Sequence, residues 1–440
     1  MKSLLIQGGR IIDPARGIDR VGNLLIVEGK IAWVGKADEL PAQSDYTVLP
    51  ARGLVVCPGF IDLHCHLREP GFEAKETIAT GTRAAARGGF TTVCCMPNTE
   101  PPLDSPATID LVRAKAEKEG AVRVLPIACI SKGRQGKELA PMAELAAAGA
   151  IGFSDDGAPV LDSEVMRQAL EKSRELGLPI IEHCEDTDLT KGAAINEGRI
   201  SLALGLPGMP ARAEETMVAR NLKLAEKTGG WLHVAHVSTA GSLELIRQAK
   251  AKGVRVTAEV TPHHLTLTED RVRECGAGAK VNPPLRTRQD VQALIQGLKD
   301  SVIDIIATDH APHTEADKRG DLAQAAFGIS GLETALGSLM TLVHDEQISM
   351  QTLIAKLTSE PAKILGNKHG SLGTLETGAP ADVTIFDPDK EWLVDPKAFV
   401  SKGKNTPWAG FVLKGKVMAT IFQGELAYKD GVFIPFGTKQ

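Results

Sequence analysis

The run Val55-Val56-Cys57-Pro58-Gly59-Phe60-Ile61-Asp62-Leu63 is apolar, rich in β-branched and aromatic residues, and leads directly into His64-Cys65-His66. Seven later runs share this character, and a helix-length segment separates each run from the next. Strands this apolar fit a parallel sheet that is buried on both faces. Eight such units predict a closed (β/α)8 barrel of the TIM type. The other seven runs are residues 90–96, 122–130, 150–154, 179–183, 231–237, 254–259 and 303–308.

Residues 163–176 form the clearest of the connecting segments. Val165, Met166, Ala169 and Leu170 recur there at the spacing of one helical face. Ser163 belongs to the residue types that cap the amino ends of helices. The pattern therefore predicts a helix over 163–176 with Ser163 as its cap.

Both ends of the chain differ from this central part. Short runs broken by turns occupy residues 1–53 and return in residues 376–440, with Glu28-Gly29-Lys30 and Lys414-Gly415-Lys416 as predicted hairpin turns. Since a few isolated strands need hydrogen-bonding partners, the two ends are expected to pair. The prediction is a small β-sandwich domain built from residues 1–53 plus 376–440, beside a catalytic barrel domain of residues 54–375.

The composition argues against several classes of function. The chain has 440 residues, with 50 Lys and Arg against 55 Asp and Glu, which gives a net charge of −5. Neither nucleic acid nor a membrane is an expected partner, because both would favour a basic excess. The N-terminal apolar run stops at Gly8 and Gly9, before the core of a signal peptide could form, so a cytoplasmic protein is expected. Seven cysteines without CxxC spacing do not predict a disulfide framework.

Histidine and aspartate residues gather at the predicted carboxyl ends of the strands, where barrel enzymes carry their active sites. His64 and His66 are two residues apart on an extended chain and so project to the same side. Imidazole and carboxylate suit zinc or a similar divalent ion, and four His with two Asp suit two adjacent ions that share a bridge. The later candidates are His183, His236 and Asp309, together with Asp155 and Asp156, between which the sequence leaves the bridge open.

Seven motifs in the barrel region occur in the order of a known family. The HxH pair alone is typical of the amidohydrolase superfamily. Within that superfamily the chain resembles the class I bacterial dihydroorotases over nearly its whole length, because His64, Arg68, Asn98 and the run 308–313 all match. The motifs are PGFIDLHCHLREPG (58–71), MPNT (96–99), FSDDG (153–157), EHCED (182–186), AHVST (235–239), VNPPLR (281–286) and ATDHAPH (307–313).

The resemblance implies a zinc-dependent cyclic amide hydrolase of pyrimidine biosynthesis, which interconverts N-carbamoyl-L-aspartate and (S)-dihydroorotate. Two zinc ions per chain and a bridging hydroxide would do this chemistry, with Asp309 as general acid/base. Many relatives bridge their metals with a carbamylated lysine, but no lysine lies between Lys137 and Lys172 here, so a carboxylate bridge is expected. The implied ligands are His64, His66 and Asp309 for one ion, His183 and His236 for the other, and Asp156 as the bridge.

Seven residues are expected to contact the substrate. The planar guanidinium of Arg68 suits a substrate carboxylate, and Asn98 and His313 can donate hydrogen bonds to it. The full set that the resemblance implies is His66, Arg68, Asn98, Asn282, His313, Phe327 and Gly328.

Other functions stay open at this point. A hydantoinase or allantoinase would use similar metals, usually with the lysine bridge, and would have less need of Arg68, Asn98 and His313. A non-catalytic dihydroorotase-like partner of aspartate transcarbamoylase would keep the fold but lose the metal ligands, all six of which are present. A homodimer and an association of the active enzyme with aspartate transcarbamoylase are both compatible with the resemblance. Residues 314–326 are either a solvated loop or a lid over the substrate.

Overall fold

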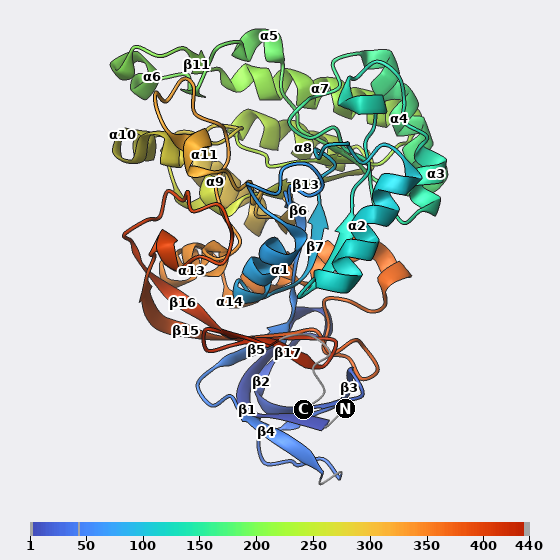
Figure 1. The fold of residues 1–440 in the computed structure, drawn as a ribbon, viewed down its shortest axis with the longest axis vertical. Coiled ribbons are helices and arrows are strands. Elements are labelled where there is room, and N and C mark those ends of the chain that lie inside the picture. The colour runs from blue at the N-terminus through green and yellow to red at the C-terminus, as the bar shows by residue number, and fades with distance from the viewer. Residues whose placement is uncertain (1–2, 43–44, 435–440) are drawn as a thin grey trace.

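The computed structural model describes residues 3–42 and 45–434. Its larger part is a closed parallel barrel, of which Figure 1 labels the strands β6, β7 and β13. Two groups of hydrogen-bonded strands form most of the barrel. Parallel bridges from Phe153 to Ala128 and Ile180, and from His310 to Cys65, join the two groups. Eight strand positions therefore surround the core, as predicted. The groups are β6 (Phe60–Cys65), β7 (Phe90–Cys95) and β8 (Arg123–Pro126), and β9 (Ile180–Glu182), β12 (Leu232–Val234), β13 (Val256–Val260) and β14 (Ile305–Ile306).

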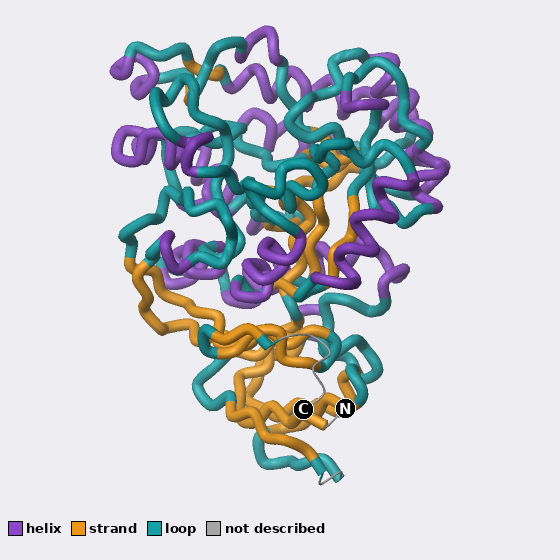
Figure 2. The backbone as a smooth tube through the Cα atoms, viewed as in Figure 1, coloured by secondary structure: helices purple, strands orange, loops and turns teal. Residues whose placement is uncertain are grey.

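Helices cover the outside of the barrel (Figure 2). α4 (Ser163–Leu176) has the predicted bounds and buries its predicted apolar face. Its cap, however, is Asp162 rather than Ser163, because the Asp162 carboxylate accepts hydrogen bonds from the backbone N–H groups of Glu164 and Val165. The other helices of at least six residues are α1 (Ile78–Arg87), α2 (Pro106–Glu119), α3 (Met142–Ala147), α6 (Arg199–Leu204), α7 (Ala211–Thr228), α8 (Ala240–Ala251), α10 (Asp270–Cys275), α11 (Arg288–Lys299), α13 (Ala335–His344), α14 (Met350–Leu357) and α15 (Ser359–Leu365).

Strands from both ends of the chain pair in one nine-stranded sheet, which we call the terminal sheet. Its order is β18-β17-β16-β15-β5-β1-β2-β3, with β4 paired to β1. Figure 1 places it below the barrel. Apolar side chains of its two ends, such as Ile6, Leu24 and Ile421, pack in one core. The strands are β1 (Ser3–Asp13), β2 (Ile18–Val27), β3 (Lys30–Lys36), β4 (Tyr46–Pro50), β5 (Val55–Pro58), β15 (Val383–Leu393), β16 (Val412–Phe422), β17 (Glu425–Lys429) and β18 (Val432–Phe433).

The run 55–63 contains two strands rather than the single strand predicted. β5 lies in the terminal sheet, parallel to β1 and antiparallel to β15, and β6 begins the barrel at Phe60. Gly59 lies between them, and a Cβ on Gly59 would be 2.1 Å from the Thr91 hydroxyl oxygen. Only glycine therefore lets the chain pass this close to β7 as it leaves one sheet for the other.

Lys414-Gly415-Lys416 is not a turn, and this prediction is wrong. β16 continues through all three residues, and it pairs with β15 on both sides of Gly415. Gly415 has φ +92°, and a Cβ there would be 2.5 Å from Met340 Cγ of α13. Glycine at this position in β16 thus allows the strand to lie close to α13. The predicted turn at Glu28-Gly29-Lys30 does connect β2 to β3.

The seven cysteines are all free thiols, as expected from their spacing. Within the described residues, no helix is both long and apolar enough to cross a membrane.

Candidate metal centre and substrate pocket

The six predicted ligands meet at the carboxyl ends of the barrel strands, in what we call the histidine–aspartate cluster: His64, His66, Asp156, His183, His236 and Asp309. Asp156 lies at its centre. Asp156 Oδ1 is 3.5 Å from His64 Nε2, and Asp156 Oδ2 is 3.5 Å from His66 Nε2. On the other side, Asp156 Oδ1 is 3.7 Å from His183 Nδ1 and 3.6 Å from His236 Nε2.

Asp309 joins the first side of the cluster. Its Oδ1 is 3.1 Å from His66 Nε2 and 3.5 Å from His64 Nε2. Burial opposes ionisation of this carboxyl, but the neighbouring His64 and His66 outweigh burial and lower the pKa of Asp309. Asp309 is therefore an anion within reach of two imidazole rings.

The geometry of the cluster fits metal binding better than hydrogen bonding among its own residues. Two overlapping groups, each with three ligand atoms within 4.8 Å of one another, share Asp156: one contains His64 and His66, the other His183 and His236. His64 Nε2 and Asp156 Oδ1 are buried and have no hydrogen-bond partner in the described part of the chain. Unpartnered buried atoms are costly, and lone pairs that face one another across a gap suit a cation.

The structure also distinguishes the two neighbouring aspartates. Asp155 Oδ1 accepts hydrogen bonds from the backbone N–H groups of Ile130, at 2.9 Å, and Ser131, at 3.2 Å. The Ser131 hydroxyl donates to its other oxygen. Asp155 is thus engaged with the loop after β8, while Asp156 faces the histidines.

Carboxylates that the sequence analysis did not assign hold the outer nitrogens of the histidines. Glu259 Oε1 lies 2.5 Å from His64 Nδ1, and Glu185 Oε2 lies 2.8 Å from His183 Nε2. Burial alone would raise the pKa of Glu185, but His183 lowers it to about 2. The available signals were that Glu259 ends a predicted strand, as the ligands do, and that Glu185 follows His183 in EHCED.

Asn98 has a similar role toward His66. Its Oδ1 lies 2.8 Å from His66 Nδ1, and Asn98 also lines the pocket beside the cluster. Asn282 Nδ2 donates to Glu185 Oε2 at 2.8 Å, so Asn282 fixes the carboxylate that holds His183. Two residues predicted as substrate contacts therefore also orient the ligands.

Three residues of this region have strained backbones. Arg68, His236 and Asp309 have φ values of 61°, 33° and 46°, in the left-handed region that residues with a Cβ seldom adopt. Such strain persists only where surrounding structure imposes it, and it is concentrated at functional sites.

A pocket of about 210 Å³ opens onto the cluster. All seven residues predicted to contact substrate line it, together with ligands of both groups. The lining residues are His66, Arg68, Asn98, Asp156, Gly157, His183, His236, Asn282, Asp309, Ala311, His313, Phe327 and Gly328.

Arg68 is the main cationic group of this pocket. Its Nε donates to the Pro312 carbonyl at 3.3 Å, and burial lowers the pKa of Arg68 to about 10, so the guanidinium stays charged near neutral pH. Burial, followed by Arg68, lowers the pKa of His313 to about 3, so this ring is neutral. His313 Nε2 lies 2.7 Å from the Phe327 carbonyl, which already accepts its proton.

Hydrogen bonds hold the segment after His313 at one side of the pocket. Lys318, at the end of α12 (Glu315–Lys318), donates from Nζ to the carbonyls of Ala326, at 2.7 Å, and Gly328, at 2.9 Å. The Asn405 amide donates to the same Gly328 carbonyl at 2.7 Å. Residues 314–328 therefore form a loop that hydrogen bonds hold in place in this structure.

A (β/α)8 barrel with this cluster at the carboxyl ends of its strands defines a member of the amidohydrolase superfamily. The family model described as "Dihydro-orotase-like" matches residues 53–242. A dihydroorotase of Pelotomaculum thermopropionicum is 53% identical over 98% of this chain and 99% of its own, and one of Aquifex aeolicus is 48% identical over 98% and 100%. Among solved structures, the L-hydantoinase of Arthrobacter aurescens is 25% identical with a TM-score of 0.88, covering 99% of this chain and 98% of its own.

The chain belongs to the dihydroorotase family. It is an enzyme, a cyclic amide hydrolase, and its histidine and aspartate groups are metal-binding.

Proposed function

We propose that the pocket carries out the dihydroorotase reaction, the reversible closure of N-carbamoyl-L-aspartate to (S)-dihydroorotate and water. Relatives named dihydroorotase match almost the whole chain at about half identity, whereas the hydantoinases match it at about a quarter, so the hydantoinase alternative is not favoured. The observation that carries the proposal is a half-buried, charged Arg68 in the same pocket as Asp309. The substrate has a carboxylate for this cation to bind.

We propose two zinc ions in the cluster. His64, His66 and Asp309 would hold one, His183 and His236 the other, and Asp156 would bridge them, in keeping with its contacts to both sides. When bound, the ions polarise the carbonyl and lower the pKa of a water molecule from 15.7 toward about 7.

Asp309 would move the proton. Its carboxylate lines the pocket and is ionised, so it can accept a proton from the attacking water and deliver it to the departing ring nitrogen. In the ring-closing direction, the same oxygen would take a proton from the ureido nitrogen. Asp309 Oδ1 lies 3.1 Å from His66 Nε2, beside the proposed metal position.

Arg68 and Asn98 would bind the substrate carboxylate. The Asn98 amide is oriented by His66, since His66 Nδ1–H donates to Oδ1 and turns Nδ2 outward. A carboxylate would accept hydrogen bonds from this amide and from the guanidinium fork. A ligand without a carboxylate would leave both donors without that partner in a half-buried pocket.

Hydrolysis of dihydroorotate by metal-loaded protein, followed by absorbance with hydantoin in parallel, tests the proposal. We expect turnover of dihydroorotate and at least about 10²-fold lower kcat/KM for hydantoin, because the site is built to pair a carboxylate. Equal turnover of the two rings would favour the hydantoinase alternative. No turnover at full metal loading would favour a non-catalytic partner.

Family membership supports further proposals about the whole protein. These are a cytoplasmic location, a homodimer, an association with aspartate transcarbamoylase, and a division into residues 54–375 and residues 1–53 plus 376–440. Sedimentation of the protein alone and mixed with aspartate transcarbamoylase tests the two assemblies, and a mixture that sediments as separate species would reject the association.

A further inference from the structure

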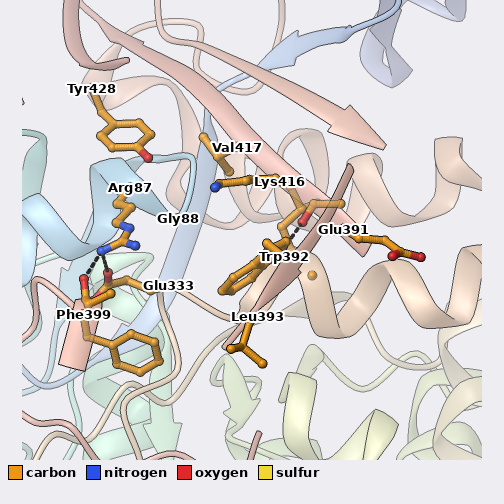
Figure 3. Close-up of a pocket in the computed structure, with 14 residues that line it drawn as sticks. Arg87, Gly88, Glu333, Glu391, Trp392, Leu393, Phe399, Lys416, Val417 and Tyr428 are labelled. Carbon is orange, nitrogen blue, oxygen red and sulfur yellow. Dashed lines mark hydrogen bonds and ion pairs between the residues drawn. The ribbon is translucent and has the colours of Figure 1, made fainter. Parts of the chain in front are cut away.

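A second cavity, of about 400 Å³, lies where the barrel meets the terminal sheet (Figure 3). α1 and α13 line it on the barrel side, and β15, β16 and β17 line it on the other. It shares no lining residue with the pocket over the cluster. Its volume falls within the range of about 300 to 1,000 Å³ typical of small-molecule sites.

Polar groups converge on one side of this cavity. Figure 3 shows the Lys416 ammonium, the Tyr428 hydroxyl and the Arg87 guanidinium directed toward a common space. Arg87 Nη1 pairs with Glu333 Oε2 at 3.0 Å. Glu333 also accepts hydrogen bonds from the backbone N–H groups of Val400 and Ser401, so its carboxylate is fully engaged.

The second cation of the lining is Lys416. Within residues 3–42 and 45–434, no hydrogen bond or ion pair engages its ammonium. Burial lowers the pKa of Lys416, and the positive charges of Lys390 and Arg87 lower it further, against a smaller opposing effect of Asp430. The other acidic group of the lining, Glu391, points away in Figure 3 and pairs with Lys414 at 3.6 Å.

Aromatic side chains form the rest of the wall. The rings of Trp392 and Phe399 face the cavity in Figure 3, and Leu336 and Val417 also line it. Trp392 Nε1–H donates to the Gly415 carbonyl at 2.9 Å, which fixes the indole in place. Fixed aromatic faces bury a flat ring at little entropic cost.

We propose that this cavity binds a small aromatic carboxylate, with its carboxylate at Lys416 and its ring against Trp392 and Phe399. One unpaired ammonium matches one negative charge, which argues for a monoanion. The bound carboxylate would also offset the repulsion between Lys416 and Arg87. A neutral ring of the same shape would gain only the apolar contact.

The test is a ligand-observed fluorine NMR titration with 4-fluorobenzoate and its neutral match, 4-fluorobenzamide. Excess N-carbamoyl-L-aspartate occupies the pocket that contains Arg68. We expect 4-fluorobenzoate to bind more tightly than 4-fluorobenzamide, and Lys416→Met to weaken 4-fluorobenzoate by at least about fivefold while changing 4-fluorobenzamide less than about twofold.

Lys429→Met is the matched control, because Lys429 lies on the neighbouring strand β17, is half-buried like Lys416 and does not line the cavity. It should leave both affinities unchanged, and the two variants should unfold at similar temperatures because neither side chain is fully buried. Absence of 4-fluorobenzoate binding, equal affinity for the two probes, or equal effects of Lys416→Met and Lys429→Met would each overturn the proposal.

Discussion

Glu259 Oε1 lies 2.5 Å from His64 Nδ1, and the other oxygen of the same carboxylate lies 3.1 Å from His233 Nε2. Glu259 is fully buried at the end of β13. Burial would raise its pKa, but His64 and His233 outweigh burial and lower it, so the carboxylate is charged. The contact makes Nδ1 the donor and leaves the His64 Nε2 lone pair directed at Asp156, as metal binding requires.

Glu259→Gln should therefore weaken metal binding. The amide keeps the shape of the side chain but loses the charge that orients His64, so we expect about 10- to 100-fold lower zinc affinity, measured by competition with a chelator. Glu175→Gln, on the exposed face of α4, serves as the control. Unchanged zinc affinity in Glu259→Gln would remove Glu259 from this positioning role.

Asp309→Asn tests proton transfer. The amide cannot carry the proton, so kcat should fall by about 10² to 10⁴ in both directions. Because Asp309 is also a proposed ligand, metal content is measured on the same sample. Full turnover by a metal-loaded Asp309→Asn protein would exclude the proposed role.

Arg68→Met tests the carboxylate clamp. The variant should keep its metals, since Arg68 is not a proposed ligand, and lose at least ~2 kcal/mol, about thirtyfold, in kcat/KM for dihydroorotate. Trace hydrolysis of an unsubstituted cyclic imide should change little. Arg113→Met, on the exposed face of α2, is the control. The clamp is wrong if Arg68→Met hydrolyses dihydroorotate like the unmodified enzyme.

Glu182 should make stability depend on pH. Burial raises its pKa from the ordinary 4.5 to about 8. Between these values the folded state keeps a proton that the unfolded chain releases, so the free energy of unfolding should fall as pH rises, by at most about 1.4 kcal/mol per pH unit. Glu182→Gln removes this contribution.

Thermal unfolding of metal-free protein at pH 5.5 and pH 8 measures the effect, because bound cations would lower the pKa of Glu182. The unmodified protein should lose more stability over this interval than Glu182→Gln. Parallel losses in the two proteins would show that Glu182 ionises at the same pH whether or not the chain is folded.

Local patterns predicted most of the fold because its strands are apolar and its helices amphipathic. The bounds of α4 follow from one helical face. The pattern does not show which sheet a strand joins, so the division of 55–63 between two sheets depends on contacts to residues far along the chain. Likewise, Glu28-Gly29-Lys30 and Lys414-Gly415-Lys416 look alike locally, and only pairing with β15 makes the second a strand.

The candidate site was predictable in so far as its ligand residues lie at the ends of predicted strands. The ligand candidates all lie there. The structure brings six of them together, while Asp155 contacts the loop after β8 instead. The choice between Asp155 and Asp156 depends on which carboxylate the backbone after β8 engages, and no residue pattern reports this. Glu259 and His64 are 195 residues apart in the sequence, and only the closed barrel brings them into contact. No local pattern could therefore predict this contact.

Stepwise addition of zinc to metal-free protein, with dihydroorotate hydrolysis followed by absorbance after each addition, tests the central claim most directly. Two ligand groups that share Asp156 predict that activity rises until about two ions are bound per chain. Full activity with one ion per chain would contradict the shared two-metal centre, and no hydrolysis at any zinc loading would contradict the proposed reaction itself.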